Sequence, residues 1–154
     1  MCDLAGVDIA PRIVACAERH LSQMGLAADL RVTDAEVSLP WPSQSFDVVT
    51  MTGVLHHFPH ATDALKQVHR VMRPAAALIL IDPWFPPIVR QLINQYLRIR
   101  PRDGDFRFWA PTEVAGLFAL HGLNVSHQRR AVWHSFLIVG KLQAIQPYSP
   151  VTET

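Results

Sequence analysis

The sequence predicts an α/β fold built around a sheet with parallel strands. Two apolar segments, 46–51 and 75–81, are rich in valine, isoleucine, leucine or alanine, which is typical of strands buried on both faces of a sheet. Amphipathic segments with the length of helices lie between the strand-like segments, and this alternation favours right-handed helical crossovers. At 154 residues, the chain has the size of one domain.

The first half of the chain is predicted to run strand, helix, strand, strand, helix, strand. Pro11 suits the first position of a helix, apolar residues then recur at helical spacing, and Gly25 ends the pattern. The expected strands cover residues 4–7, 30–32, 46–51 and 75–81, and the expected helices cover 11–24 and 65–72. Pro40 and Pro42 keep the intervening segment in an extended loop, because proline lacks a backbone donor and restricts the residue before it.

The last third of the chain is predicted to contain a helical excursion and a hairpin. Residues 84–109 are too long for a simple loop, and 88–99 are amphipathic, so we expect a lid-like excursion that covers a site. The elements expected after it are a helix at 111–121, two strands of an antiparallel hairpin at 123–130 and 133–142, and a frayed tail at 146–154. We therefore expect a single domain over residues 1–145.

Charge and composition exclude several classes of function. The formal net charge is +1. The sequence pattern contains no basic face, so nucleic acid is not expected as a partner. The longest uninterrupted apolar run, 75–81, has seven residues, far below the roughly 18 that cross a bilayer, so no membrane partner is expected. Cys2 and Cys16 cannot form a disulfide framework. These observations predict a cytoplasmic domain and leave its oligomeric state open.

Two acidic residues stand where successive strands are expected to end. Asp8 closes the first strand just before a helix, and Asp34 follows the second strand. Ligands bind at the carboxyl edge of open α/β sheets, and a carboxylate there can accept hydrogen bonds from both hydroxyls of a ribose. Capping of a helix or a turn is the alternative for each acid taken alone, but the pair favours a nucleoside site.

An ordered set of short motifs adds to this pattern. The segments are 6–11 (GVDIAP), 34–35 (DA), 39–40 (LP), 45–49 (SFDVV), 54–58 (VLHHF) and 68–74 (VHRVMRP). In this order and spacing they resemble the class I S-adenosylmethionine-dependent methyltransferases, particularly the small-molecule branch. The resemblance covers residues 4 to about 83, and 109–142 less specifically. It implies a Rossmann-like methyltransferase sheet with helices on both faces, S-adenosylmethionine as the cofactor, and a small-molecule methyl acceptor.

The resemblance also implies a set of cofactor-binding residues. They are Asp8, Ile9, Asp34, Ala35, Thr52, Gly53 and Val54. Asp8 is expected to bind the ribose hydroxyls and Ile9 to contact a face of the adenine. Asp34 and Ala35 are expected at the polar edge of the adenine, and the three residues from Thr52 onward at the methionine end and the methyl group.

Two neighbouring histidines are the candidate catalytic residues. Methyl transfer mainly requires donor and acceptor to be held at attack distance with water excluded, but a hydroxyl or protonated amine must also lose a proton. His57 is the first choice for the proton acceptor and His56 the second, because a histidine has a suitable unperturbed pKa. His60 completes an H-H-x-x-H cluster, which we interpret as lining a pocket rather than holding a metal, so no metal is expected.

The chain departs from the family pattern in two places. In the family, a first strand and a glycine-rich turn come before the strand that ends in the acid corresponding to Asp8. In this sequence only seven residues precede Asp8. We therefore expect the first central strand to be missing and the chain to be truncated at its N-terminus. The strand ending at Asp8 and the one starting at Phe46 should then close on each other or leave a gap. Ala75 and Ala76 replace two glycines, and we expect that turn to relax.

Two other functions share the same residues. A degenerate, non-catalytic domain would retain the fold without the cofactor glycines. An NAD(P)-dependent oxidoreductase would share the strand-end acid, although the segment 46–58 resembles that class less. Five aromatic residues of the excursion either line an apolar acceptor pocket or pack onto the sheet; they are Trp84, Phe85, Phe106, Phe108 and Trp109.

Overall fold

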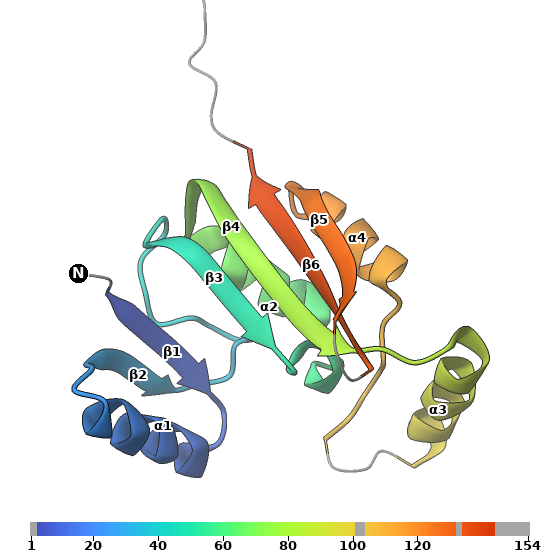
Figure 1. Cartoon of the computed structure of the whole chain (residues 1–154), viewed down its shortest axis with the longest axis horizontal. Helices are drawn as coiled ribbons and strands as arrows, with labels where there is room; N and C mark the ends of the chain where they lie inside the picture. Colours follow the sequence, from blue (N-terminus) through green and yellow to red (C-terminus); the bar gives the residue numbers. More distant parts are fainter. Residues whose placement is uncertain (1–2, 101–103, 132–133, 144–154) are drawn as a thin grey trace, which may run out of the picture.

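The computed structural model describes residues 3–100, 104–131 and 134–143, and it has the α/β architecture expected (Figure 1). The elements in chain order are β1 (Leu4–Asp8), α1 (Pro11–Gln23), β2 (Ala28–Val32), β3 (Phe46–Thr52), the short 3-10 helix η1 (Leu55–His57), α2 (Ala61–Val71), β4 (Met72–Pro83), α3 (Pro87–Ile99), α4 (Pro111–Leu120), β5 (Leu123–Ala131) and β6 (Ser135–Leu142). The tail expected at 146–154 and the expected strand start at Trp133 lie outside the described residues.

Four strands form the main sheet, in the order β3-β4-β6-β5. β3 and β4 are parallel, whereas β6 runs antiparallel to both β4 and β5. The expected C-terminal antiparallel hairpin is therefore confirmed. The carboxyl ends of β1, β3 and β4 point the same way in Figure 1, so residues that follow these strands lie at one end of the molecule.

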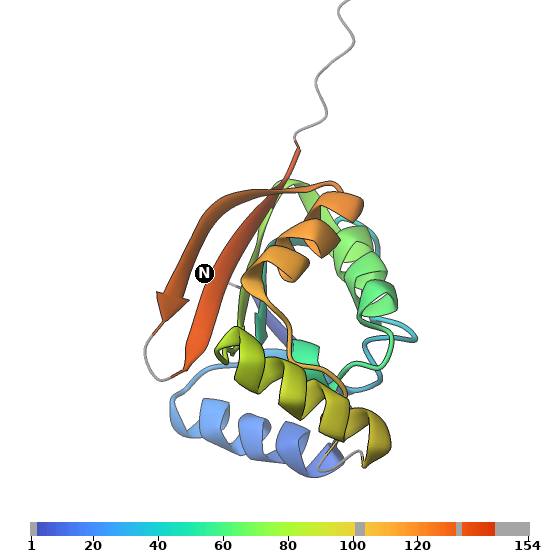
Figure 2. The same cartoon turned by 90° about the vertical axis from the view of Figure 1, so that its right-hand side faces the viewer.

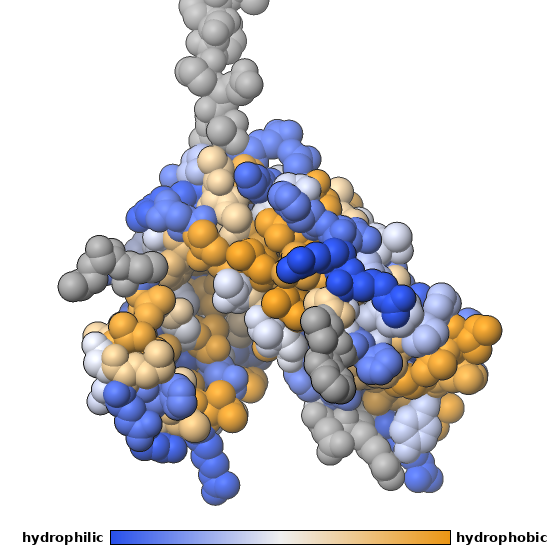
Figure 3. Space-filling view, viewed as in Figure 1, coloured by the Kyte–Doolittle hydropathy of each residue, from blue (hydrophilic) through white to orange (hydrophobic). Residues whose placement is uncertain are grey.

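The helices cover the main sheet unevenly. α2 and α4 lie together on one of its faces (Figure 2), whereas its other face shows apolar side chains at the surface (Figure 3). Val48 on this sheet is 55% exposed. Helices on both faces were expected, but among the described elements the full helical layer is seen on one face, while α1 packs instead on β1 and β2.

The core lies between the main sheet and its two helices. Leu78 and Leu80 alternate with less buried neighbours along β4 and are fully buried, as strand geometry requires for one face of a sheet. Phe118 of α4 is also fully buried and lies over Gly140 of β6. A Cβ atom at Gly140 would come 2.5 Å from Cδ2 of the Phe118 ring. Glycine at this position therefore lets the helix approach the sheet.

β1 and β2 form a separate parallel pair, in register from Leu4 opposite Ala28 to Asp8 opposite Val32. β1 is not paired with β3 in the described structure, so of the two expected arrangements the gap is the one observed. Several apolar side chains around this pair are exposed, among them Val32 at 52% and Ile13 of α1 at 56%.

The expectation that the turn at Ala75 relaxes is wrong. Ala75 has φ 67°, in the left-handed region where a Cβ costs about 1 kcal/mol or more. The residue lies where β4 carries extra residues opposite β3: Phe46 pairs with Met72, but Val48 pairs with Ala77. The pairing on both sides of this irregularity holds the strained conformation. The same pairing makes Met72 the first residue of β4 rather than part of the helix before it.

The excursion after β4 is tied back at several points. Asn94 of α3 exchanges two hydrogen bonds with the backbone of Phe108, both 2.8 Å. Glu113 of α4 accepts hydrogen bonds from Arg90, Arg107 and the Ala110 amide. Partial burial opposes ionisation of Glu113, but the Ala110 and Arg107 hydrogen bonds outweigh it, so the pKa of Glu113 is lowered. A lid role for this segment stays a prediction.

α3 leaves an apolar stripe at the surface. Its exposed apolar residues are Ile88, Val89, Leu92, Tyr96 and Ile99, and an orange region lies over this helix at the lower right of Figure 3. None of the helices in the described ranges is both long enough and apolar enough to span a bilayer.

Candidate functional site

The two strand-end acids lie at the same edge of the small sheet. Asp8 pairs with Val32, two residues before Asp34, and the Thr33 amide donates to the Asp8 carbonyl oxygen at 3.1 Å. Carboxylates at opposite edges of the sheet could not bind one ligand. The register places both acids at the carboxyl end of the strands, as parallel pairing requires.

Each of these carboxylates also makes a local turn contact. Oδ1 of Asp8 accepts a hydrogen bond from the Ala10 amide at 2.7 Å, and Oδ1 of Asp34 accepts one from the Glu36 amide at 2.9 Å. In the described part of the chain, Oδ2 of neither acid accepts a hydrogen bond. The turn alternative is thus observed for both acids, but Asp8 does not cap α1, whose N-cap Ala10 has no side-chain cap hydrogen bond. One carboxylate oxygen of each acid remains available to a ligand.

The remaining candidate residues differ in exposure. Ile9 is 68% exposed, and Ala35 packs against the edge of the core. Thr52 is exposed at the end of β3, and Val54 is half-buried. Gly53 between them has φ 63°, and no heavy atom lies within 4 Å of the position of a Cβ. Its amide is not free, because it donates to the Ile81 carbonyl oxygen at 2.7 Å.

A hydrogen bond connects the loop after β2 to the loop after η1. The side chain of Glu36, two residues after Asp34, accepts from the backbone amide of His60. Segments 34–36 and 55–60 are thus in contact although they follow strands of different sheets. Asp34 and the candidate histidines consequently share one end of the molecule.

His56 is held in a buried pair with Asp82. Only 7% of His56 is exposed, and its Nδ1 lies 2.9 Å from Oδ1 of Asp82, the residue near the end of β4. Its ring stacks on Phe108, with the centroids 5.1 Å apart. Asp82 is 1% exposed, and its Oδ2 has no hydrogen-bond partner among the described residues. Since a carboxylate accepts, Nδ1 of His56 carries the proton and Nε2 faces away from Asp82.

We expect Asp82→Ala to lower the free energy of unfolding by about 1.5–3 kcal/mol, because it leaves the buried Nδ1–H of His56 without an acceptor. Urea denaturation followed by tryptophan fluorescence measures this change. Asp47→Ala is the matched control, since Asp47 pairs with Arg73 on the surface and its side chain is 76% exposed, where ion pairs contribute little. Equal losses in the two variants would contradict the structural importance of the buried pair.

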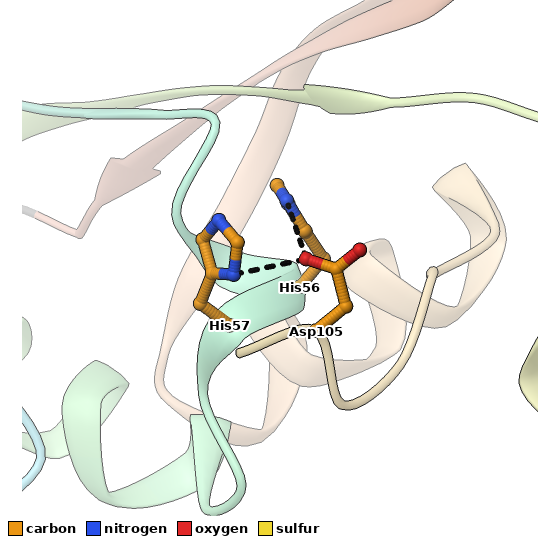
Figure 4. Close-up of side chains that lie close together, drawn as sticks. All are labelled: His56, His57 and Asp105. Atoms are coloured by element: carbon orange, nitrogen blue, oxygen red, sulfur yellow. Dashed lines mark ion pairs between the residues drawn. The ribbon is translucent and has the colours of Figure 1, made fainter. Parts of the chain in front are cut away.

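His57 is oriented by the segment that returns from the excursion. Its Nδ1 lies 3.1 Å from Oδ1 of Asp105 and 3.2 Å from the Gly104 carbonyl oxygen, and its side chain is 42% exposed (Figure 4). Both neighbours are acceptors, so Nδ1 carries the proton and Nε2 of the neutral ring is an exposed acceptor. The same segment is fixed to η1, because the amides of Phe106 and Arg107 donate to the His56 carbonyl oxygen.

Sequence reasoning missed Asp82 and Asp105 as site residues. Asp82 follows the apolar segment 75–81 and could have been found as a third acid at a strand end. No sequence pattern pointed to Asp105, because it lies in a loop about 50 residues after the two histidines and does not end a strand. Nor does the H-H-x-x-H motif form a unit: His56 and His57 gather with Asp105, and His60 lies outside this group.

The aromatic residues of the excursion mostly pack. Trp84 and Trp109 contact the edge of the core, and Phe85 meets Phe108 edge to face, with the centroids 4.9 Å apart. Phe106 is 45% exposed. A surface cavity of about 450 Å³ lies beside it, lined by Phe58, Pro59, His60, Ala61, Thr62, Asp63, Phe106, Arg107 and Trp109. Packing thus accounts for most of the set, and two of its members reach a cavity.

Comparison with protein families gives a match over the first half of the chain. Residues 1–80 match the family described as "Methyltransferase domain". This range includes the two strand-end acids, the glycine after β3 and both candidate histidines.

Individual relatives agree with this match. The chain is 29% identical over 97 residues to a protein of Bacillus subtilis named uncharacterized methyltransferase YcgJ, an alignment that covers 62% of this chain and 38% of the relative. It is 33% identical over 85 residues to the demethylmenaquinone methyltransferase of Thermus thermophilus, covering 55% of this chain and 37% of the relative. The chain thus spans about two fifths of the length of these curated relatives.

Solved structures show the same fold. The YcgJ crystal structure superposes with a TM-score of 0.75 at 19% identity, covering 92% of this chain and 82% of that one. The structure of a SAM-dependent methyltransferase from Aquifex aeolicus superposes with a TM-score of 0.72 at 17% identity, covering 91% and 69%.

Proposed function

Because the chain belongs to the methyltransferase domain family, we propose that it transfers a methyl group from S-adenosylmethionine to a small-molecule acceptor. The observation that carries the proposal is the pair of carboxylates, Asp8 and Asp34, at one edge of the β1–β2 sheet. Solved structures of this fold support a shared architecture, but a fold alone does not define a reaction. The residues at this edge are therefore the ones that support the proposed reaction.

The residues present suit the adenosine part of the cofactor. The Oδ2 atoms of Asp8 and Asp34 are available as acceptors, for the ribose hydroxyls and the exocyclic amino group respectively. Ile9 offers an exposed apolar side chain to a face of the adenine, and Ala35 lies beside Asp34. The open space next to Gly53 leaves room for the methionine end, with Thr52 and Val54 on either side.

The reaction needs few catalytic groups. When bound, S-adenosylmethionine supplies a methyl carbon that is already activated by a positively charged sulfur. As the acceptor oxygen or nitrogen bonds to this carbon, the carbon–sulfur bond would break and leave a neutral thioether, and Nε2 of His57 would accept the O–H or N–H proton of the acceptor. Asp105 and the Gly104 carbonyl keep the other ring nitrogen protonated, which leaves Nε2 as the acceptor. His56 is the second candidate, but its ring is buried and its Nε2 faces Asp105 at 3.7 Å.

The aromatic cavity supports an acceptor with a flat, apolar part. Phe58, Phe106 and Trp109 line it next to the loop that carries His57. An aromatic or conjugated acceptor would stack on such side chains. We therefore place the acceptor between this cavity and Gly53.

Cofactor binding tests the proposal. We expect the chain to bind S-adenosylmethionine in the micromolar range by isothermal titration calorimetry, and Asp8→Ala to weaken binding by about 10- to 100-fold, the value of one or two hydrogen bonds to a charged group. Asp47→Ala is the matched control, because Asp47 is a surface acid near the start of β3 that pairs with Arg73 and does not line the cavity.

The alternative of a non-catalytic domain predicts a different result. If the chain binds no S-adenosylmethionine at millimolar concentration while remaining folded, the methyl-transfer proposal fails and a degenerate domain is the better explanation. If Asp8→Ala and Asp47→Ala bind equally well, the assignment of Asp8 to the ribose fails.

A further inference from the structure

We propose that His56, His57 and Asp105 form a binding site for a divalent transition-metal ion of the zinc type. The three residues come from η1 and from the segment that returns after α3, and Figure 4 shows their side chains converging. One donor atom from each lies within 4.8 Å of the others. The proposal concerns binding alone and does not depend on the methyl-transfer function.

The spacing of the donor atoms is compatible with a single ion. Oδ1 of Asp105 lies 3.1 Å from Nδ1 of His57 and 3.7 Å from Nε2 of His56. Zinc binds nitrogen and oxygen ligands at about 2.0–2.2 Å, so neighbouring ligands of a tetrahedral ion lie about 3.3–3.6 Å apart. The two distances to Asp105 lie on either side of this range. The donor atoms of His56 and His57 lie within 4.8 Å of each other, so the half-exposed His57 ring has to approach His56 by up to about 1.3 Å to share one ion.

The buried carboxylate of Asp82 provides the outer support that such sites use. A metal-binding histidine typically donates its other ring N–H to a carboxylate or carbonyl, which fixes the ring and its tautomer. Here Asp82 accepts from Nδ1 of His56 at 2.9 Å, so Nε2 presents its lone pair toward Asp105. The 3.7 Å between these two atoms is too long for a hydrogen bond. A cation between them would satisfy both lone pairs.

The donor set indicates the class of ion. Two imidazole nitrogens and one carboxylate oxygen suit zinc, cobalt or nickel better than magnesium or calcium, which prefer oxygen ligands only. Three protein ligands leave a fourth position for water. The exposed half of His57 gives the ion a route from solvent.

Metal binding would change the state of His57. With a metal on Nδ1, the neutral ring carries its proton on Nε2 and can no longer accept one. If the proposed methyl transfer is correct, Zn²⁺ is therefore expected to inhibit it, and a chelator to restore it. This consequence rests on the proposed function, whereas the metal site itself does not.

Titration of the metal-free 154-residue chain with Co²⁺ tests the site directly. We expect one Co²⁺ per chain, the intense visible absorption of a low-coordinate site, and its loss when equimolar Zn²⁺ displaces the cobalt. Asp105→Asn should weaken Co²⁺ binding by at least about tenfold. His60→Gln, a histidine three residues from His57 and outside the group, is the matched control and should bind as the wild type does.

Folding and function are separated in the same experiment. Circular dichroism of metal-free Asp105→Asn should match the wild type, because Asp105 lies in a loop and its side chain is 27% exposed; if it does not, His57→Gln replaces it in the comparison. Co²⁺ binding that is absent, or equally strong in the ligand variant and in His60→Gln, overturns the metal site. Intact S-adenosylmethionine binding beside absent Co²⁺ binding would overturn the metal site alone and leave the proposed function standing.

Discussion

Replacing His57 with alanine is expected to lower turnover by about 100- to 10,000-fold, the range that general acid–base groups contribute. The reason is the exposed Nε2 of His57, which Asp105 and Gly104 keep unprotonated by holding the proton on Nδ1. S-adenosylmethionine affinity should stay within about twofold of the wild type, because His57 is placed at the acceptor and not at the adenosine. Steady-state methyl transfer and calorimetric binding of the cofactor measure the two quantities.

A distant histidine provides the control for this comparison. His69 is exposed on α2, away from the carboxyl ends of the strands, and His69→Ala should keep both turnover and affinity. Unchanged turnover in His57→Ala would exclude His57 as the proton acceptor and leave His56 as the candidate. A parallel loss of cofactor affinity would instead place His57 in the cofactor site.

The largest effect on stability is expected for Phe118→Ala, at about 3–5 kcal/mol in the free energy of unfolding. Phe118 is 0% exposed, and its ring fills the space that Gly140 leaves between α4 and β6. Removing the ring opens a cavity that the rigid strand cannot close. Urea denaturation at equilibrium measures the loss. Phe118→Leu, which retains most of the volume, should lose much less and serves if the alanine variant does not fold.

Leu120→Ala on the same helix is the matched control. Leu120 is 79% exposed, so its removal should change the free energy of unfolding by no more than about 0.5 kcal/mol. Comparable losses for Phe118→Ala and Leu120→Ala would mean that α4 does not pack on the main sheet as described.

The sequence predicted the local elements well, because hydrophobic spacing and proline or glycine positions are local signals. The helix starting at Pro11 and the strand starting at Phe46 begin where expected. Prediction from the sequence was less successful where strand pairing decides the backbone conformation. Met72 fits the helical pattern but joins β4, and Ala75 keeps a positive φ because the strand on each side of it is already paired.

Some residues of the candidate site were also predicted from local signals, whereas others were found only in the structure. Strand order along the chain was enough to expect Asp8 and Asp34 at one edge, since parallel strands end together, and the register agrees. Only the tertiary structure brought Asp105 to His57 and Asp82 to His56, because these contacts join segments far apart in the chain. The sequence by itself determined which segments form strands and helices and which acids end the strands. Long-range packing decided which ring nitrogens carry protons and which remain open to an acceptor or an ion.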